Sequence, residues 1–220
     1  MGRSPRAAEG GLVYHAWNRA NAGLHLFEQD DDYEAFEEVL AEARKRFAVP
    51  LLAFCLLPEH WHLVVQPERD GDLCRFLGWL TQTHTRRRHA RDRSAGHLYQ
   101  GRFRSFPVQA DHHFLTVCRY VERNPVRLGW VPRAEEWCWS SLWRRERGSA
   151  EATALLGEGP VARPEGWAAW VNAPEAIGDL QALRRCLRRG RPFGSPSWVQ
   201  QTAERLGLGV TLRPRGRPRR

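Results

Sequence analysis

Two short apolar segments joined by a two-residue turn constrain the fold of this chain most strongly. Residues 51–57 read LLAFCLL, Pro58 and Glu59 follow, and residues 60–67 read HWHLVVQP. A continuous apolar run of this length is typical of a buried strand and is far too short for a membrane-spanning helix. We therefore predict a β-hairpin whose first strand lies in a hydrophobic core.

Strand-like and helix-like patterns alternate on either side of this hairpin. The predicted strands span residues 11–18, 51–57, 60–67 and 102–109, and the predicted helices begin at Asp30, Asp72 and Asp111. Aspartate favours the first turn of a helix, and Pro125 disfavours helical geometry at Asn124, so the third helix should end there. Hairpins and helices mixed in this order predict an α+β fold with a mostly antiparallel sheet.

Charge is divided unevenly along the chain. The 220 residues include 34 basic and 25 acidic ones, a formal net charge of +9. Residues 184–220 hold 11 arginines against one acid, a net charge of +10, which leaves −1 for residues 1–183. Because the guanidinium group binds phosphate through paired hydrogen bonds, this segment predicts a polyanionic partner, with nucleic acid first.

We divide the chain into three parts: residues 1–148, a connector at 149–183 and a basic tail at 184–220. The Trp-rich residues 130–148 should pack over the sheet, and the connector should hold only short helices. In the tail, the sequence PRGRP places Arg215 and Arg217 as in an AT-hook, which inserts arginines into a minor groove.

The cysteines and the N-terminus exclude other classes of protein. Five scattered cysteines without a CxxC pair argue against a disulfide framework or a zinc ribbon, and the N-terminus lacks the apolar core of a signal peptide. We therefore expect a cytoplasmic protein without a membrane segment.

Two groups of side chains suggest chemistry. His60 and His62 share one face of their strand, with Trp61 on the other, and two neighbouring imidazoles form half of a divalent metal site. Tyr120 and Asn124 lie one turn apart, off the apolar stripe of their helix. The alternatives are ordinary strand histidines that pack or hydrogen-bond, and a boundary tyrosine with its hydroxyl in water.

These blocks resemble a known family. The segment LLAFCLLPEHWHLVVQP looks like the signature strand of the single-tyrosine HUH transposases, which are IS200-like. YQGRFRSFPV (99–108) and YVERNPVRLGWV (120–131) resemble the blocks that follow it in the REP-associated tyrosine transposases. The C-terminal GRPFGSPSWVQQTAERLGL is similar to the tail of that branch.

The resemblance implies a ferredoxin-like HUH nuclease core over residues 1–148 and a bacterial, nucleoid-associated enzyme. It implies Mg²⁺ or Mn²⁺ held by His60, His62 and Asn124, with Tyr120 as the nucleophile that forms a covalent 5′-phosphotyrosine. Its substrate would be single-stranded DNA with imperfect palindromic hairpins. Glu59 stands where the family commonly has Asn, which places a carboxylate beside the metal site.

Further residues are candidates for DNA contact, with solvated or salt-bridged surface arginines as the alternative. They are Arg86, Arg87, Arg88, Arg102, Arg104, Arg127, Arg215 and Arg217. Tyr99 is the next candidate nucleophile, and we interpret His112 and His113 as a pair on the surface or behind a ligand, rather than as ligands themselves. A non-catalytic hairpin-binding regulator and a metal-dependent hydrolase remain alternatives, as do a monomer and a homodimer.

Overall fold

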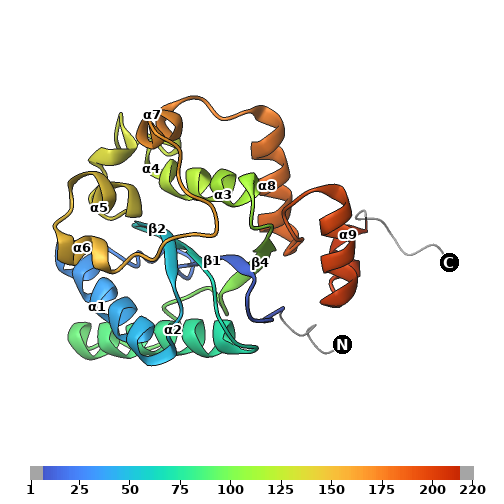
Figure 1. Cartoon of the computed structure of the whole chain (residues 1–220). Helices are drawn as coiled ribbons and strands as arrows, with labels where there is room; N and C mark the ends of the chain where they lie inside the picture. The colour runs from blue at the N-terminus through green and yellow to red at the C-terminus, as the bar shows by residue number, and fades with distance from the viewer. Residues whose placement is uncertain (1–6, 214–220) are drawn as a thin grey trace.

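Four strands pair into one antiparallel sheet in the order β2-β3-β1-β4 (Figure 1). The structure is a computed structural model that describes residues 7–213. Its strands are β1 (Val13–Arg19), β2 (Leu51–Leu57), β3 (His60–Val65) and β4 (Arg104–Val108). Its longer helices are α1 (Asp30–Phe47), α2 (Asp72–Asp92), α3 (His112–Glu122), α8 (Ile177–Arg189) and α9 (Pro196–Arg205). Its short helices are α4 (Asn124–Arg127), η1 (Ala134–Glu136), α5 (Ser141–Arg147), α6 (Ala150–Ala154), α7 (Trp167–Asn172) and α10 (Gly209–Leu212).

The predicted hairpin forms the centre of this arrangement. Leu57 pairs with His60 across the two-residue turn, and every residue of β2 is buried. Helix α1 follows β1, and helix α2 follows β3. This sequence of elements, together with the strand order, is that of a ferredoxin-like fold. The α+β fold predicted from the sequence is therefore confirmed.

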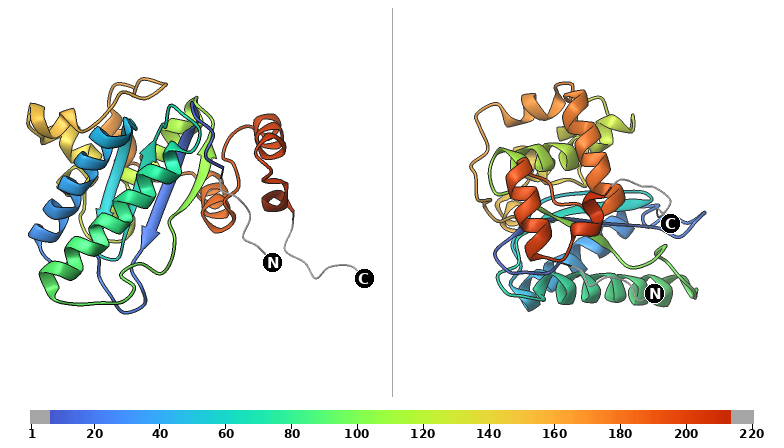
Figure 2. Two further views of the ribbon diagram at one scale, coloured as in Figure 1. Left: turned by 90° about the horizontal axis from the view of Figure 1, so that it is seen from below. Right: turned by 90° about the vertical axis from the view of Figure 1, so that its right-hand side faces the viewer.

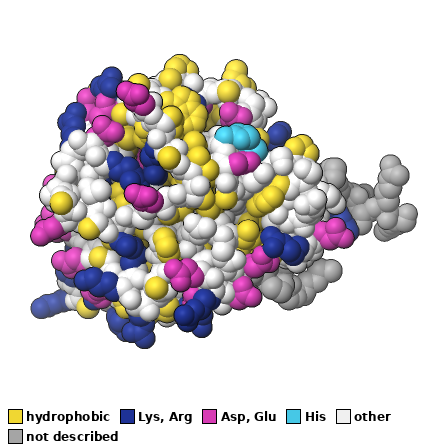
Figure 3. Space-filling view, viewed as in Figure 1, with side chains coloured by type: hydrophobic (Ala, Val, Ile, Leu, Met, Phe, Trp, Pro, Cys, Tyr) yellow, Lys and Arg dark blue, Asp and Glu magenta, His cyan; other side chains and the backbone are white. Residues whose placement is uncertain are grey.

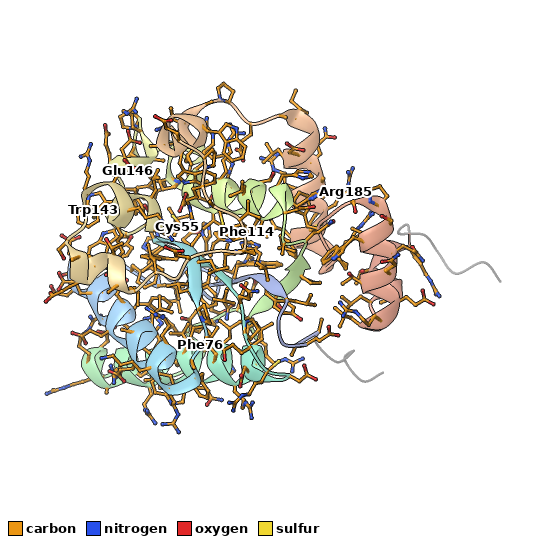
Figure 4. All side chains as sticks on the ribbon, in the orientation of Figure 1. Cys55, Phe76, Phe114, Trp143, Glu146 and Arg185 are labelled. Carbon is orange, nitrogen blue, oxygen red and sulfur yellow. The ribbon has the colours of Figure 1, made fainter. Side chains whose placement is uncertain are left out.

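Helices cover both faces of the sheet. α1 and α2 lie side by side on one face, and α3 lies on the other with α5, α7 and α8 around it (Figures 1 and 2). Phe76 of α2 and Phe114 of α3, both fully buried, mark the two cores on either side of the strands (Figure 4). Alternate residues of β1 and β3 therefore enter different cores.

The ends of the helices differ in detail from the prediction. α1 is preceded by Gln29 as its cap, while Asp32 accepts hydrogen bonds from the backbone N–H groups of Glu28 and Gln29. The cap of α2 is Gly71, whose φ of 82° is a conformation that glycine adopts freely. Asp111 caps α3 as predicted, because its carboxylate accepts the backbone N–H of His113.

The described part of the basic segment is folded. α8 runs across residue 183, and its Leu183 and Cys186 are buried against the core around α3. Phe193 then bridges to Val108 at the edge of β4, and α9 and α10 follow. Arg215 and Arg217 lie outside the described residues.

The surface of the folded chain carries charges of both signs. Basic and acidic side chains are interspersed over the face drawn in Figure 3, in keeping with the net charge of −1 for residues 1–183. Among residues 7–213, no helix is long and apolar enough to cross a membrane.

Candidate active site

Strand β3 presents two histidines to the core that α3 covers. The rings of His60 and His62 are perpendicular, with centroids 5.1 Å apart. Trp61 points to the other face, where its indole N–H donates to the Tyr99 hydroxyl over 3.2 Å. The alternation predicted for this strand is therefore confirmed.

Helix α3 brings Tyr120 to these histidines. The Tyr120 ring stands edge-on to His62, with 6.1 Å between the ring centroids. The side chain is mostly buried, and its hydroxyl makes no hydrogen bond to any residue within 7–213. The geometry thus places a phenol and two imidazoles around one site.

The other tyrosines lie on the opposite side of the sheet. Tyr14, Tyr33 and Tyr99 all belong to the core beneath α1 and α2. Tyr99 is held there by Trp61 and by His84, whose Nδ1 lies 2.7 Å from its hydroxyl. The alternative nucleophile considered from the sequence is thus separated from the histidines by the sheet itself.

Arg127 ties the tyrosine to its surroundings. Its guanidinium carbon lies 4.0 Å from the centroid of the Tyr120 ring, a cation–π contact. The same group donates to the Asn124 side-chain oxygen at 3.0 Å and to the Tyr120 carbonyl at 2.9 Å. It also pairs with Glu175 at 3.0 Å. Arg127, proposed from the sequence as a phosphate contact, is therefore already part of a local network.

His15 was missed by the sequence analysis. It lies on β1, fully buried, with its Nε2 3.0 Å from Nδ1 of His62 and its ring 6.3 Å from that of Tyr120. Its other nitrogen, Nδ1, is buried without a hydrogen-bond partner among the described residues. The signal available in the sequence was only its position on the first predicted strand.

Burial sets the protonation of the site. It lowers the pKa of His60 to about 4, although the Glu59 carboxylate opposes this, and it lowers the pKa of His62 well below its usual value. Both imidazoles are therefore neutral at pH 7. Burial raises the pKa of Tyr120, and the charge of Arg127 opposes that rise.

These side chains fit a divalent metal ion. Neutral imidazoles are metal ligands, and the Asn124 oxygen keeps one lone pair beside its hydrogen bond from Arg127. Two nitrogens and one amide oxygen suit Mn²⁺, or Mg²⁺ with further oxygens from substrate and water. The Glu59 carboxylate is exposed and lies 3.9 Å from His25.

The arginines proposed for DNA contact separate into two groups. Arg87 pairs with Glu42 at 2.8 Å, and Arg88, which is 13% exposed, pairs with Asp32 at 3.0 Å. Arg86 and Arg102 instead line one cavity of about 580 Å³. Arg104 lies with Arg102 in two neighbouring cavities.

A second cluster lies at the other end of α3. The ligand atoms of Asp111, His112 and His113 lie within 4.8 Å of one another, the only such group of three His, Cys, Asp or Glu residues among residues 7–213. Asp111 uses its carboxylate to cap the helix and to bond the His113 ring at 2.8 Å. About two turns of helix separate this cluster from Tyr120.

The chain is similar in sequence to known proteins. A sequence model of the family described as "Transposase IS200 like" matches residues 10–124, just over half of the chain, and this range includes both histidines, Tyr120 and Asn124. A REP-associated tyrosine transposase of Escherichia coli is 23% identical over 137 residues, which is 62% of this chain and 79% of that protein. A Haemophilus influenzae protein given the same description provisionally is 26% identical over 125 residues, 52% of this chain and 70% of that protein.

A solved structure shares the fold. The structure of a REP-associated tyrosine transposase bound to a REP hairpin has a TM-score of 0.58 and 22% identity to this chain, and it covers 67% of this chain and 87% of its own. The ferredoxin-like sheet, the face that carries histidines and tyrosine, and the family match lead to one conclusion. The chain belongs to the IS200-like transposase family, and its relatives are tyrosine transposases.

Proposed function

We propose that this protein cuts and rejoins single-stranded DNA at short palindromic hairpins, with Tyr120 as the nucleophile. One observation carries the proposal: the Tyr120 ring lies 6.1 Å from that of His62, whereas the other three tyrosines belong to the core on the opposite side of the sheet. The solved relative is described as bound to a REP hairpin, which supports the class of substrate.

The reaction exchanges one phosphodiester bond for another. The Tyr120 oxygen attacks phosphorus, the bond to the 3′ oxygen breaks, and the phenolic proton passes to solvent while the departing oxygen takes up a proton. The products are a 5′-phosphotyrosine and a free 3′-OH. Attack by the 3′-OH of another strand reverses these steps, so rejoining needs no external energy source.

We assign the metal to His60, His62 and Asn124. When bound, Mg²⁺ or Mn²⁺ would polarise a non-bridging phosphate oxygen and neutralise charge that develops on it. The residues of the chain supply the rest. β3 holds the imidazoles neutral by burying them, and α3 and α4 hold Tyr120 and Asn124 on the same side.

Arg127 prepares the nucleophile. Burial raises the pKa of Tyr120, so its hydroxyl is protonated at neutral pH. A guanidinium 4.0 Å from the ring centroid favours the phenolate over the phenol and so assists loss of the proton. Its hydrogen bond to the Tyr120 carbonyl also fixes the end of α3.

The test is formation of a covalent adduct. Hairpin DNA with single-stranded flanks is incubated with the protein and Mg²⁺ or Mn²⁺, and denaturing gels reveal any DNA-linked protein. Tyr120→Phe should abolish the adduct and keep binding. Tyr99→Phe is the matched control and should keep the adduct, because Tyr99 lies on the other side of the sheet.

Each alternative has its own outcome. An adduct that persists in Tyr120→Phe would overturn the assignment of the nucleophile. Cleavage without any adduct would identify a metal-dependent hydrolase. Binding without cleavage in either metal would identify a hairpin-binding regulator with the same fold.

A further inference from the structure

Strand β4 forms one edge of the sheet (Figure 2). A groove lined in part by residues of β4 lies along this edge. Two cavities meet there, of about 530 and 430 Å³, and both are lined by Trp17, Arg102 and Arg104. The first extends to Arg19, which pairs with His60 across β1 and β3. The second extends to α8. The groove therefore extends from Arg19, the neighbour of His60 in the sheet, to helix α8.

The lining of this groove is cationic. Arg19, Arg102, Arg104, Arg188 and Arg189 line it, and no Asp or Glu of the described chain does. Arg102 and Arg104 form no ion pair within residues 7–213, in contrast to Arg87 and Arg88. A concave surface lined by arginines without neutralising carboxylates attracts and holds phosphates.

One aromatic ring lies among these cations. Trp17 is the cross-strand neighbour of His62 on β3 and of Arg104 on β4. Its ring stacks on His15 at 5.5 Å and meets Phe106 edge-on at 6.0 Å. The indole is thus held in place from within the sheet, remains partly exposed and lines both cavities.

We propose that this groove binds the single-stranded DNA next to the scissile phosphate, with one nucleobase stacked on Trp17. Grooves that combine arginines with an aromatic platform bind single strands, because every unpaired base has a free face for stacking. Bases within a duplex are stacked on each other and cannot use the platform. The proposal rests on the proposed function for the identity of the strand, but it concerns binding alone.

Photochemical cross-linking tests the contact in the unmodified protein. A 16-nucleotide dT strand with 5-iodo-deoxyuridine at single positions is bound in EDTA, which prevents metal-dependent cleavage, and is irradiated. Mass spectrometry of the peptides should place a cross-link on Trp17. Cross-links confined to residues outside the groove would overturn the proposal.

Affinity for the same strand gives an independent measurement. Trp17→Ala should weaken binding between about 5- and 100-fold with an unchanged salt slope, since stacking carries no charge, and Trp17→Phe should recover most of the loss. Arg104→Gln should instead make the slope of log K against log salt shallower by about 0.7.

The control is Trp143→Ala, because Trp143 is also half-buried but lies on α5, outside the groove. Figure 4 shows Trp143 on the opposite side of the molecule from Arg185 of α8, the helix that borders the groove. Trp143→Ala should bind as the wild type does. Wild-type affinity in Trp17→Ala, or an equal loss in Trp143→Ala, would contradict the stacking contact. So would a duplex of the same length that competes as well as the single strand.

The outcomes separate this proposal from the catalytic one. A normal covalent adduct together with wild-type affinity in Trp17→Ala would overturn only the groove. A cross-link at Trp17 in a protein that never forms an adduct would support the groove and overturn the proposed cleavage.

Discussion

Among single residues, Arg127 contacts the proposed nucleophile twice, through the ring and through the backbone carbonyl of Tyr120. It packs over the Tyr120 ring, donates to Asn124 and pairs with Glu175. Arg127→Met keeps much of the side chain's bulk but removes the charge. The pKa of Tyr120 should rise, adduct formation should slow roughly tenfold at pH 7, and its rate–pH profile should move to higher pH.

Arg127→Lys separates charge from shape. Lysine keeps the positive charge but loses the planar fork that reaches Asn124 and Glu175 together. Arg127→Lys should therefore move the rate–pH profile part of the way back toward that of the wild type. The rate of adduct formation at pH 7 should stay close to that of Arg127→Met. An unchanged profile in Arg127→Met, measured by single-turnover kinetics, would contradict a role for this charge.

His15 is the second residue whose role follows from geometry. For His62 to offer Nε2 to a metal, its Nδ1 must carry the proton, and His15 Nε2 at 3.0 Å is positioned to accept it. His15→Leu should therefore weaken Mn²⁺ binding about 10- to 100-fold, as measured by calorimetry.

The matched control is His84→Leu. His84 is also buried, but it bonds Tyr99 on the other side of the sheet. Both variants should lose stability, and only His15→Leu should lose metal affinity. Equal losses of metal affinity would show that His15 acts only through the fold.

At the scale of elements, the placement of α3 depends on a buried carboxylate. Glu122 is fully buried and accepts hydrogen bonds from the Ser141 hydroxyl and the Trp167 indole, each at 2.6 Å. It thereby ties α3 to α5 and α7. Glu122→Ala leaves the buried Trp167 indole N–H without an acceptor and leaves the Ser141 hydroxyl only the Phe54 carbonyl, at 3.2 Å. The free energy of unfolding should therefore fall by about 1–3 kcal/mol.

Urea unfolding measures this effect, with Glu146→Ala as the control. Glu146 is exposed on α5 (Figure 4), and its substitution should change the free energy of unfolding by less than about 0.5 kcal/mol. Equal effects of the two substitutions would contradict the role of Glu122 as an anchor.

The sequence predicted those elements whose signals are local. The hairpin at 51–65 and the helix that carries Tyr120 follow from apolar periodicity and proline positions, and the structure confirms both. It did not predict that His15 meets His62, because that contact depends on the register of β1 against β3, 47 residues apart in the chain. The ion pairs of Arg88 with Asp32 and of Arg127 with Glu175 could not be predicted for the same reason. Each joins residues that are far apart in the chain and meet only in the folded structure.

At the scale of the whole molecule, buried histidines make stability depend on pH. Burial lowers the pKa of His15 and of His84 to about 3 and that of His60 to about 4, from an ordinary value of 6.5. Below pH 6.5 the unfolded chain binds protons that the native state does not. Stability should therefore be lost as pH falls from 6.5 toward 4, each histidine contributing up to about 1.4 kcal/mol per pH unit.

Urea unfolding at pH 7 and pH 5 measures this dependence in the metal-free protein. His84→Asn removes one such group far from the proposed metal ligands and should give a smaller loss between the two pH values. The same loss in this variant as in the wild type would contradict the assignment.

The basic tail is tested best without disturbing the folded part. Because α8 crosses residue 183 and is buried at Leu183 and Cys186, a cut there would unfold a helix. Deletion of residues 214–220 removes Arg215 and Arg217 while it spares all described elements. Hairpin binding should weaken, with a shallower salt slope and an unchanged melting temperature. Unchanged affinity and slope would show that these arginines make no DNA contact.

The proposed reaction requires that Tyr120 becomes covalently linked to DNA. The most direct measurement is mass spectrometry of the proteolysed adduct formed with hairpin DNA and Mn²⁺. We expect a nucleotide on the peptide that contains Tyr120 and none on the peptides that contain Tyr14, Tyr33 or Tyr99. A nucleotide on one of these three tyrosines, or cleaved DNA with no modified peptide, would contradict it.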